Sequence, residues 1–484
     1  MRRKDGKTER RKVGGQMTVR PSVVPSVRRE TLWSPDGELD PRLLDFTVGD
    51  DRYWDSHLIR FDVLGSLGHV EGLRASGLLT APEHRKLREG LRSALRAVER
   101  GRLVIGPEHE DAHSAVEQWL TRRLGRTGER LHTGRSRNDQ IACDLRLFLK
   151  DRLIALGYGA LEVSAELLRF AERHRTALWP GYTHTRRAMP SSAGLWAAAF
   201  AEGLIDSLEA LPALWAQVDR SPLGSAAGYG VPLPLDREAA ATALGFAGLE
   251  HNVATVQNGR GKLEAAALFW CVQAGHEISR LASDVILFSA EEYGWLVLPP
   301  GLATGSSIMP QKRNPDLLEL ARARAAALEG DLAAVLALRA RLPSGYHRDF
   351  QLLKEPLIRG LGRALELFGM VSLVVPRLQV DRARGLAALD GGTLATDQVM
   401  ARVERGEPFR RAYRAVAAAL RRGEPVPVPP PARILARRGS TGGLGRLELG
   451  RAWRRWNAAE RWCERERDRF TRAMARLAGG RGRA

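Results

Sequence analysis

Residues 305–316 read GSSIMPQKRNPD, a stretch that places a hydroxyl, a cation and an amide on one short loop. Lys312 and Asn314 follow Ser306 by six and eight positions, and Gly305 lets the backbone approach a ligand closely. Groups of these types can take a proton from a carbon beside a carboxylate and hold the negative charge that develops. The stretch therefore predicts a catalytic loop, on which the interpretation of the remaining chain depends.

Four further stretches are rich in polar residues that could bind a ligand or take part in catalysis. They read HTGRSRNDQ at 132–140, GYTHTRRAMP at 181–190, SPLGSAAGY at 221–229 and GYHRDFQLLK at 345–354. The first opens a predicted long helix, where donors at the helix N-terminus suit a carboxylate, although a capped helix start with an exposed arginine explains it equally well. The histidine of the second is, taken alone, more often structural than catalytic.

Together the five stretches resemble the argininosuccinate lyases of the fumarase/aspartase superfamily, as a divergent branch, from about residue 40 through Tyr413. Fumarases share the serine loop, but HTGRSRNDQ and the spacing of Tyr346, Gln351 and Lys354 favour the argininosuccinate branch. Adenylosuccinate lyase resembles the chain less. The resemblance implies an all-α fold of three regions, with a central bundle of long helices that forms the core of a homotetramer. It also implies sites shared between three chains, with no metal and no organic cofactor.

The resemblance further implies a β-elimination of argininosuccinate to arginine and fumarate, through a carbanion of aci-carboxylate form, in arginine biosynthesis. In the catalytic set, Ser306 matches the general base, and Lys312 and Asn314 match the groups that stabilise the dianionic intermediate. His184 matches a histidine that acts as the acid or as an indirect helper, and Glu319 matches the carboxylate that orients it.

The residues that match substrate contacts fall into two sets. Those expected at the substrate carboxylates are Ser136, Arg137, Asn138 and Thr183, and those expected at its remainder and carboxylates are Tyr346, Gln351 and Lys354. The chain holds only eight lysines among 75 basic residues, so lysine at both Lys312 and Lys354 indicates a need for a compact ammonium rather than a planar guanidinium.

Several positions beside these motifs depart from the family pattern. Gly49-Asp50-Asp51 stands where an Asp-Ser is usual, which removes a hydroxyl, and Leu352-Leu353 replaces an acidic pair. Asn258-Gly259-Arg260-Gly261 lacks two usual carboxylates, and Arg186 replaces a glutamine. Because these changes flank the substrate, an alternative is a related fumarate-releasing lyase for another N-succinyl substrate, of the adenylosuccinate lyase or aspartase type. A non-enzymatic paralogue that kept the fold is a further alternative.

Apolar residues at helical spacing predict four long helices, at 139–174, 191–219, 261–289 and 315–342, with few strands. We expect a disordered basic tail at 1–30, an N-terminal helical domain at 31–130, a central bundle domain at 131–364 with the catalytic loop at 301–316, and a small C-terminal helical domain at 365–484.

The composition of the chain argues against nucleic-acid-binding, disulfide-stabilised and membrane-spanning proteins. The net charge is +19, but residues 1–30 and 451–484 supply 14 of these charges, and no nucleic-acid-binding motif accompanies them. A fourth hypothesis, nucleic-acid binding, therefore rests on charge alone. The three cysteines form neither a metal pattern nor a disulfide framework, and no apolar run approaches the length of a membrane span. A cytoplasmic protein that binds a small molecule is expected, without a membrane or a specific nucleic acid as partner.

Overall fold

The computed structural model describes residues 40–480, and the chain divides into two units at Val48. In the first unit the described part is helix α1 (Pro41–Val48) with the residue before it. The predicted basic tail at 1–30 lies outside the described residues. All other described elements belong to the second unit, which begins at Gly49.

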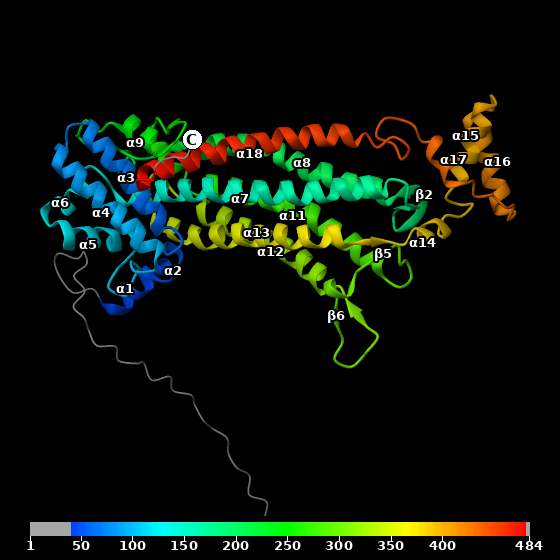
Figure 1. Cartoon of the computed structure of the whole chain (residues 1–484), viewed down its shortest axis with the longest axis horizontal. Coiled ribbons are helices and arrows are strands. Elements are labelled where there is room, and N and C mark those ends of the chain that lie inside the picture. The colour runs from blue at the N-terminus through cyan, green and yellow to red at the C-terminus, as the bar shows by residue number, and fades with distance from the viewer. Residues whose placement is uncertain (1–39, 481–484) are drawn as a thin grey trace, which may run out of the picture. The chain divides into compact units, whose positions relative to one another are not determined.

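Six long helices lie side by side in the second unit (Figure 1). They are α7 (Arg137–His174), α8 (Ala193–Val218), α11 (Lys262–Ser289), α12 (Asp316–Arg339), α13 (Lys354–Val374) and α18 (Leu449–Ala478). Their buried apolar residues form one large core, which confirms the predicted bundle of long helices. The four helices expected from spacing are α7, α8, α11 and α12, with ends within three residues of those predicted. In addition, α18 returns from the C-terminal region and packs on α7 and α8.

Helix α7 begins where the sequence supplies a cap. Ser136 has extended backbone, its Oγ accepts from Asn138 N at 3.3 Å, and Asp139 Oδ1 accepts from Ser136 N at 3.0 Å. The other oxygen of Asp139 accepts from the backbone of Gly224 and Ala226, at 3.0 and 2.9 Å. Asp139 therefore holds the turn of the SPLGSAAGY stretch against the start of the helix.

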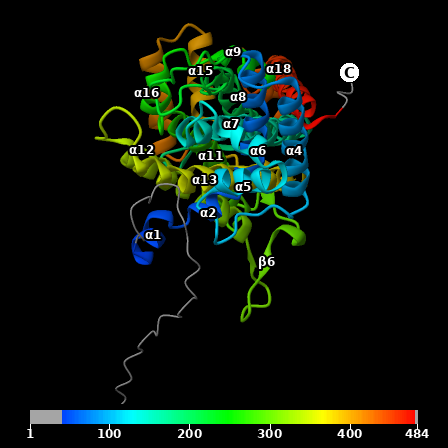
Figure 2. The same cartoon turned by 90° about the vertical axis from the view of Figure 1, so that its left-hand side faces the viewer.

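Shorter helices surround the start of α7 (Figures 1 and 2). They are α2 (Asp51–Asp55), α3 (Ile59–Ala75), α4 (Ala81–Glu99), α5 (Ala112–Leu124) and α6 (Arg126–Glu129). The remaining α-helices are α9 (Arg237–Ala243), α10 (Val253–Asn258), α14 (Arg382–Ala387), α15 (Ala395–Glu404), α16 (Phe409–Arg421) and α17 (Pro431–Ala436). Short 3₁₀ helices cover Arg130–His132, Pro300–Leu302, Arg348–Leu353 and Val375–Arg377.

Within residues 40–480 the strands form four separate two-stranded pairs. These are β1 (Leu178–Thr183) with β2 (Arg186–Ser192), β3 (Arg220–Ser221) with β4 (Gly248–Leu249), β5 (Leu296–Val297) with β8 (Gln379–Val380), and β6 (Thr304–Gly305) with β7 (Arg313–Asn314). The β3–β4 pair is parallel and the other three are antiparallel. Pairs this short build no sheet layer, so the all-α class is confirmed.

Two expectations from composition can be compared with the fold. Cys143, Cys271 and Cys463 are free and buried. Across residues 40–480 none of the helices combines the length and the apolar character needed to cross a membrane. The division into three domains is not tested by this fold and stays a prediction.

Candidate active site

The loop between β6 and β7 carries the central motif and projects from the helices in both views (Figures 1 and 2). Ser306 Oγ accepts from the backbone N–H of Met309 at 3.1 Å and of Ile308 at 3.4 Å. Asn314 Nδ2 donates to the carbonyl of Gly305 at 3.3 Å and closes the base of the loop. Lys312 is exposed. Two donors aimed at Ser306 Oγ stabilise an alkoxide there, which is what a serine needs to act as a base.

Thr183 and His184 lie at the tip of the β1–β2 hairpin and are exposed. His184 and Thr185 have φ of 52° and 56°, which defines a turn with both central residues in the left-handed region. Hairpins normally fill such a turn with Asn-Gly or Gly-Gly, because a side chain there costs roughly 1–2 kcal/mol per residue. Backbone strain of this kind is concentrated at functional positions, which favours a role for His184 over a neutral turn residue.

Glu319 lies in the first turn of α12, as expected from its place five residues after Asn314. Its side chain is exposed, and within residues 40–480 no hydrogen bond joins it to His184. A single chain therefore does not bring the predicted orienting carboxylate to the predicted histidine.

The start of α7 presents Ser136, Arg137 and Asn138. The guanidinium of Arg137 lies 2.6 Å from Glu110 Oε2 and 3.2 Å from Asp111 Oδ2, so it is anchored by the residues before α5. Burial alone would lower the pKa of Arg137, and Asp111 and Glu110 more than offset this, so its pKa is raised. The arginine is a fixed cation at a helix N-terminus.

Lys354 begins α13 and is buried with two carboxylates. Its ammonium donates to Asp55 Oδ1 at 2.6 Å and contacts Asp51 Oδ1 more closely still. The second oxygen of Asp55 accepts from Ala112 N at 3.1 Å. Burial opposes the charge on Lys354, but Asp55 and Asp51 favour it and raise the pKa. These contacts join α2, α5 and α13, and the Asp111–Arg137 pair extends them to α7.

Tyr346 and Gln351 occupy the segment that enters α13. Tyr346 is exposed and its ring centre lies 6.0 Å from that of Phe350. The N–H of Gly345 donates to Asn258 Oδ1 at 2.8 Å, which attaches this segment to the end of α10. Gln351 is half-buried in the 3₁₀ turn before Lys354. The structure thus gathers six predicted contacts near the starts of α7 and α13, and we call them the substrate cluster: Ser136, Arg137, Asn138, Tyr346, Gln351 and Lys354.

Sequence reasoning did not identify Asp51 and Asp55 as partners of Lys354. From the sequence, Asp51 is distinguished only by the lack of a hydroxyl at its position. Burial raises the pKa of Asp51 to about 6; Lys354 lowers it, and Asp55 and Asp111 raise it further. The pKa of Asp51 is thus raised by its burial and its acidic neighbours against the effect of Lys354, whereas the two acids raise the pKa of Lys354 itself. The spacing of Asp51 and Asp55 by one helical turn was the signal that could have revealed them.

Directly behind the cluster, Asp62, His113 and Asp144 are fully or almost fully buried, with ligand-type atoms within 4.8 Å of one another. His113 Nδ1 lies 3.0 Å from Asp62 Oδ1 and 3.8 Å from Asp144 Oδ2. Burial alone would lower the pKa of His113, but Asp62, Asp111 and Asp144 raise it to about 9. The raised pKa favours an imidazolium at His113 beside the Asp62 carboxylate, whereas burial and Asp62 raise the pKa of Asp144 well above its usual range.

The other predicted residues lie far from the substrate cluster in one chain. Helix α7 has 38 residues and so spans about 57 Å, with the cluster at its start and the β1–β2 hairpin after its end. Helix α12 has 24 residues, about 36 Å, with the β6–β7 loop before it and the Tyr346 segment after it. Figure 1 shows this arrangement. Three groups of predicted residues thus belong to three separate places on the bundle.

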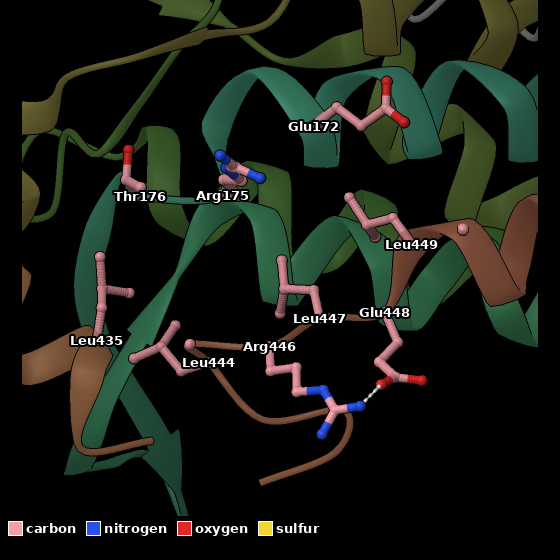
Figure 3. A pocket seen from close by; sticks show the side chains of 11 residues that line it. Glu172, Arg175, Thr176, Leu435, Leu444, Arg446, Leu447, Glu448 and Leu449 are labelled. Atoms are coloured by element: carbon pink, nitrogen blue, oxygen red, sulfur yellow. Dashed lines mark ion pairs between the residues drawn. The ribbon is translucent and has the colours of Figure 1, made fainter. Parts of the chain in front are cut away.

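A cavity of about 740 Å³ lies elsewhere, between the last turn of α7 and the segment that enters α18 (Figure 3). Arg446 and Glu448 form a 2.7 Å ion pair on its wall, and Arg175 and Leu444 also line it. None of the predicted site residues lines this cavity, so it is not a candidate for the active site.

The chain is similar to known proteins over most of its length. Residues 55–330 match the model of a family described as "Lyase". The chain is 42% identical over 388 residues to an argininosuccinate lyase of Thermotoga neapolitana, which covers 80% of this chain and 98% of that protein. It is 43% identical over 418 residues to an argininosuccinate lyase of Sorangium cellulosum, covering 86% and 96%.

Solved structures show the same fold. An EDDS lyase in complex with formate superposes with a TM-score of 0.77 at 24% identity, covering 92% of this chain and 95% of that one. A class II fumarase from Schistosoma mansoni gives a TM-score of 0.69 at 14% identity, covering 79% and 89%.

The long-helix bundle with its projecting serine loop defines a lyase of the fumarase/aspartase superfamily. Within that superfamily, the chain belongs to the argininosuccinate lyase family.

Proposed function

We propose that the protein is a carbon–nitrogen lyase that splits argininosuccinate into arginine and fumarate in arginine biosynthesis. The observation that carries this proposal is the β6–β7 loop, where Ser306 Oγ accepts two backbone N–H bonds beside Lys312 and Asn314. The relatives at about 40% identity over most of the chain support the same substrate.

In the proposed reaction, Ser306 acts as an alkoxide base and takes a proton from the succinyl carbon next to a carboxylate. The electron pair left on carbon is delocalised into that carboxylate, which becomes dianionic, and Lys312 and Asn314 stabilise the added charge. The carbon–nitrogen bond then breaks and its electron pair leaves with the guanidino nitrogen, which takes up a proton. His184 supplies or relays that proton, and Glu319 orients the imidazole.

The substrate cluster and Thr183 hold the substrate in this proposal. The N-terminus of α7 and the guanidinium of Arg137 favour carboxylates of the succinyl half. Tyr346, Gln351 and Lys354 contact the remainder. Binding energy from these contacts positions the succinyl carbon against Ser306.

We further propose a cytoplasmic homotetramer in which three chains contribute to each site. The separation of the three groups along α7 and α12 supports this assembly, because elimination requires them within a few ångströms of one substrate. The exposure of Thr183, His184 and Glu319 in one chain is consistent with surfaces that another copy covers.

A second candidate is a related lyase acting on another N-succinyl compound, favoured by the flanking departures at Asp51, Asn258 and Leu352-Leu353. Fumarate release by the purified protein from argininosuccinate, adenylosuccinate and aspartate distinguishes the two. The first proposal requires a kcat/KM for argininosuccinate far above the other two. A higher value for another substrate would replace it.

A further inference from the structure

Lys354, a predicted contact of the substrate, already has two carboxylates in this chain. Asp55 and Asp51 both bind its ammonium, and its side chain is only 5% exposed. A lysine in this state has little positive charge left to offer to a carboxylate of the substrate. The charged group that remains available to bind a substrate at this position is therefore a carboxylate and not the ammonium of the lysine.

The two acids differ in what they offer to a ligand. The Asp55 side chain is 1% exposed, and both its oxygens are satisfied, one by Lys354 and the other by Ala112 N. The Asp51 side chain is 14% exposed, and its second oxygen, Oδ2, has no partner within residues 40–480. Asp51 is thus the carboxylate that faces an incoming molecule.

The surroundings make this end of the substrate cluster negative. Around the ammonium of Lys354 two carboxylates, Asp51 and Asp55, face one cation. An excess of one negative charge in a partly buried place attracts a cation rather than a carboxylate of the substrate.

This reasoning rests on the proposed function, since it uses the charges of argininosuccinate. The succinyl half of that molecule carries two carboxylates, whereas the arginine half ends in an α-amino acid with an ammonium group. We infer that Asp51 is a specificity-determining residue that binds the α-ammonium of the arginine half through Oδ2, while Lys354 and Asp55 hold its carboxylate in place.

The carboxylate of Asp51 also affects which substrates this position favours. An N-succinyl compound whose leaving group carries a phosphate, or lacks an ammonium, meets an unfavourable charge at Asp51. The change from a hydroxyl to a carboxylate at this position thus increases selection for a substrate with a cationic amino-acid end, instead of relaxing it.

The test is a binding cycle on the full-length protein. Calorimetric titration at about pH 8 compares arginine with 5-guanidinopentanoate, which is arginine without its α-amino group, for the wild type, Asp51→Asn and Asp51→Ser. The matched control is Asp50→Asn, which removes the same charge from the exposed neighbouring residue. A change in structure alone, such as a shift of Lys354, weakens both ligands equally and leaves their ratio unchanged.

We expect the wild type and Asp50→Asn to prefer arginine by about tenfold or more, the size of one hydrogen bond between charged groups. Both Asp51 variants should bind the two ligands within about twofold of each other. A preference that survives in both variants, or a wild type that does not prefer arginine, overturns the inference. If arginine is preferred through Asp51 but argininosuccinate releases no fumarate, the proposed function fails and the ammonium site stands.

Discussion

The ammonium of Lys354 lies 2.6 Å from Asp55 Oδ1, although 299 residues separate the two in sequence. The contact joins the start of α13 to the end of α2, and Asp55 continues it to the first N–H of α5. The lysine therefore has a structural part beside its predicted part in substrate binding. Three segments that approach the substrate cluster depend on one buried cation.

Removal of that cation should destabilise the protein strongly. Lys354→Met leaves Asp55 and Asp51 without a positive partner in a buried place, and breaking one partner of such a pair costs about 3–5 kcal/mol. Lys86→Met is the control, because Lys86 is exposed on α4, and it should change stability by less than about 0.5 kcal/mol. Urea unfolding followed by circular dichroism measures both. Equal midpoints for the two variants would contradict the structural part.

His113 should make stability depend on pH above neutrality. Its folded-state pKa is about 9, above the ordinary value of 6.5, so its stabilising contribution is complete below about pH 6.5. The contribution is lost as pH rises through about 9, and a shift of this size corresponds to about 3 kcal/mol. Unfolding free energies of the wild type and His113→Gln at about pH 6.5 and 9.5 test this. The difference between the two proteins should shrink at the higher pH, and a constant difference would refute the assignment.

Arginine binding should strengthen as pH rises through about 6. Burial raises the pKa of Asp51 to about 6, so the carboxylate that we assign to the α-ammonium ionises only above that value. The groups that face it are Asp55 from the same helix, Lys354 from α13 and Asp111 from the start of α5. Calorimetry from about pH 5 to 8 should show the rise in the wild type. If the affinity of Asp51→Asn for arginine rises with pH in the same way, another group is titrating and the assignment to Asp51 is wrong.

Two inactive variants should restore activity to each other if sites are shared between chains. Ser306→Ala removes the base and Asn138→Ala alters the start of α7, and helix α12 separates the serine loop from the substrate cluster in one chain. Random mixing of the two chains leaves about one quarter of the sites with both residues intact. Co-refolded mixtures should therefore recover about a quarter of the wild-type activity. Recovery no greater than the sum of the separate variants would place each site within one chain.

Much of this arrangement was accessible from the sequence, for physical reasons that differ between regions. The four long helices follow from apolar spacing over many turns, and the start of α7 follows from Ser136 with Asp139 three residues later. The left-handed turn at His184 was not predicted, because His-Thr is a poor sequence for it and only tertiary context holds it. The pairing of Lys354 with Asp55 was not predicted because no local rule links residues 299 positions apart, and the same holds for Asp51 one helical turn earlier.

The most direct measurement of the central claim is fumarate release from argininosuccinate by the wild type and by Ser306→Ala, followed by the absorbance of fumarate. The wild type should release fumarate with argininosuccinate as its best substrate. The kcat of Ser306→Ala should fall by about a hundredfold to ten-thousandfold, the usual contribution of a general base. Its melting temperature should be unchanged, because the loop is exposed. Wild-type activity in the folded Ser306→Ala protein would contradict the role of the β6–β7 loop. No release by the wild type would contradict the function itself.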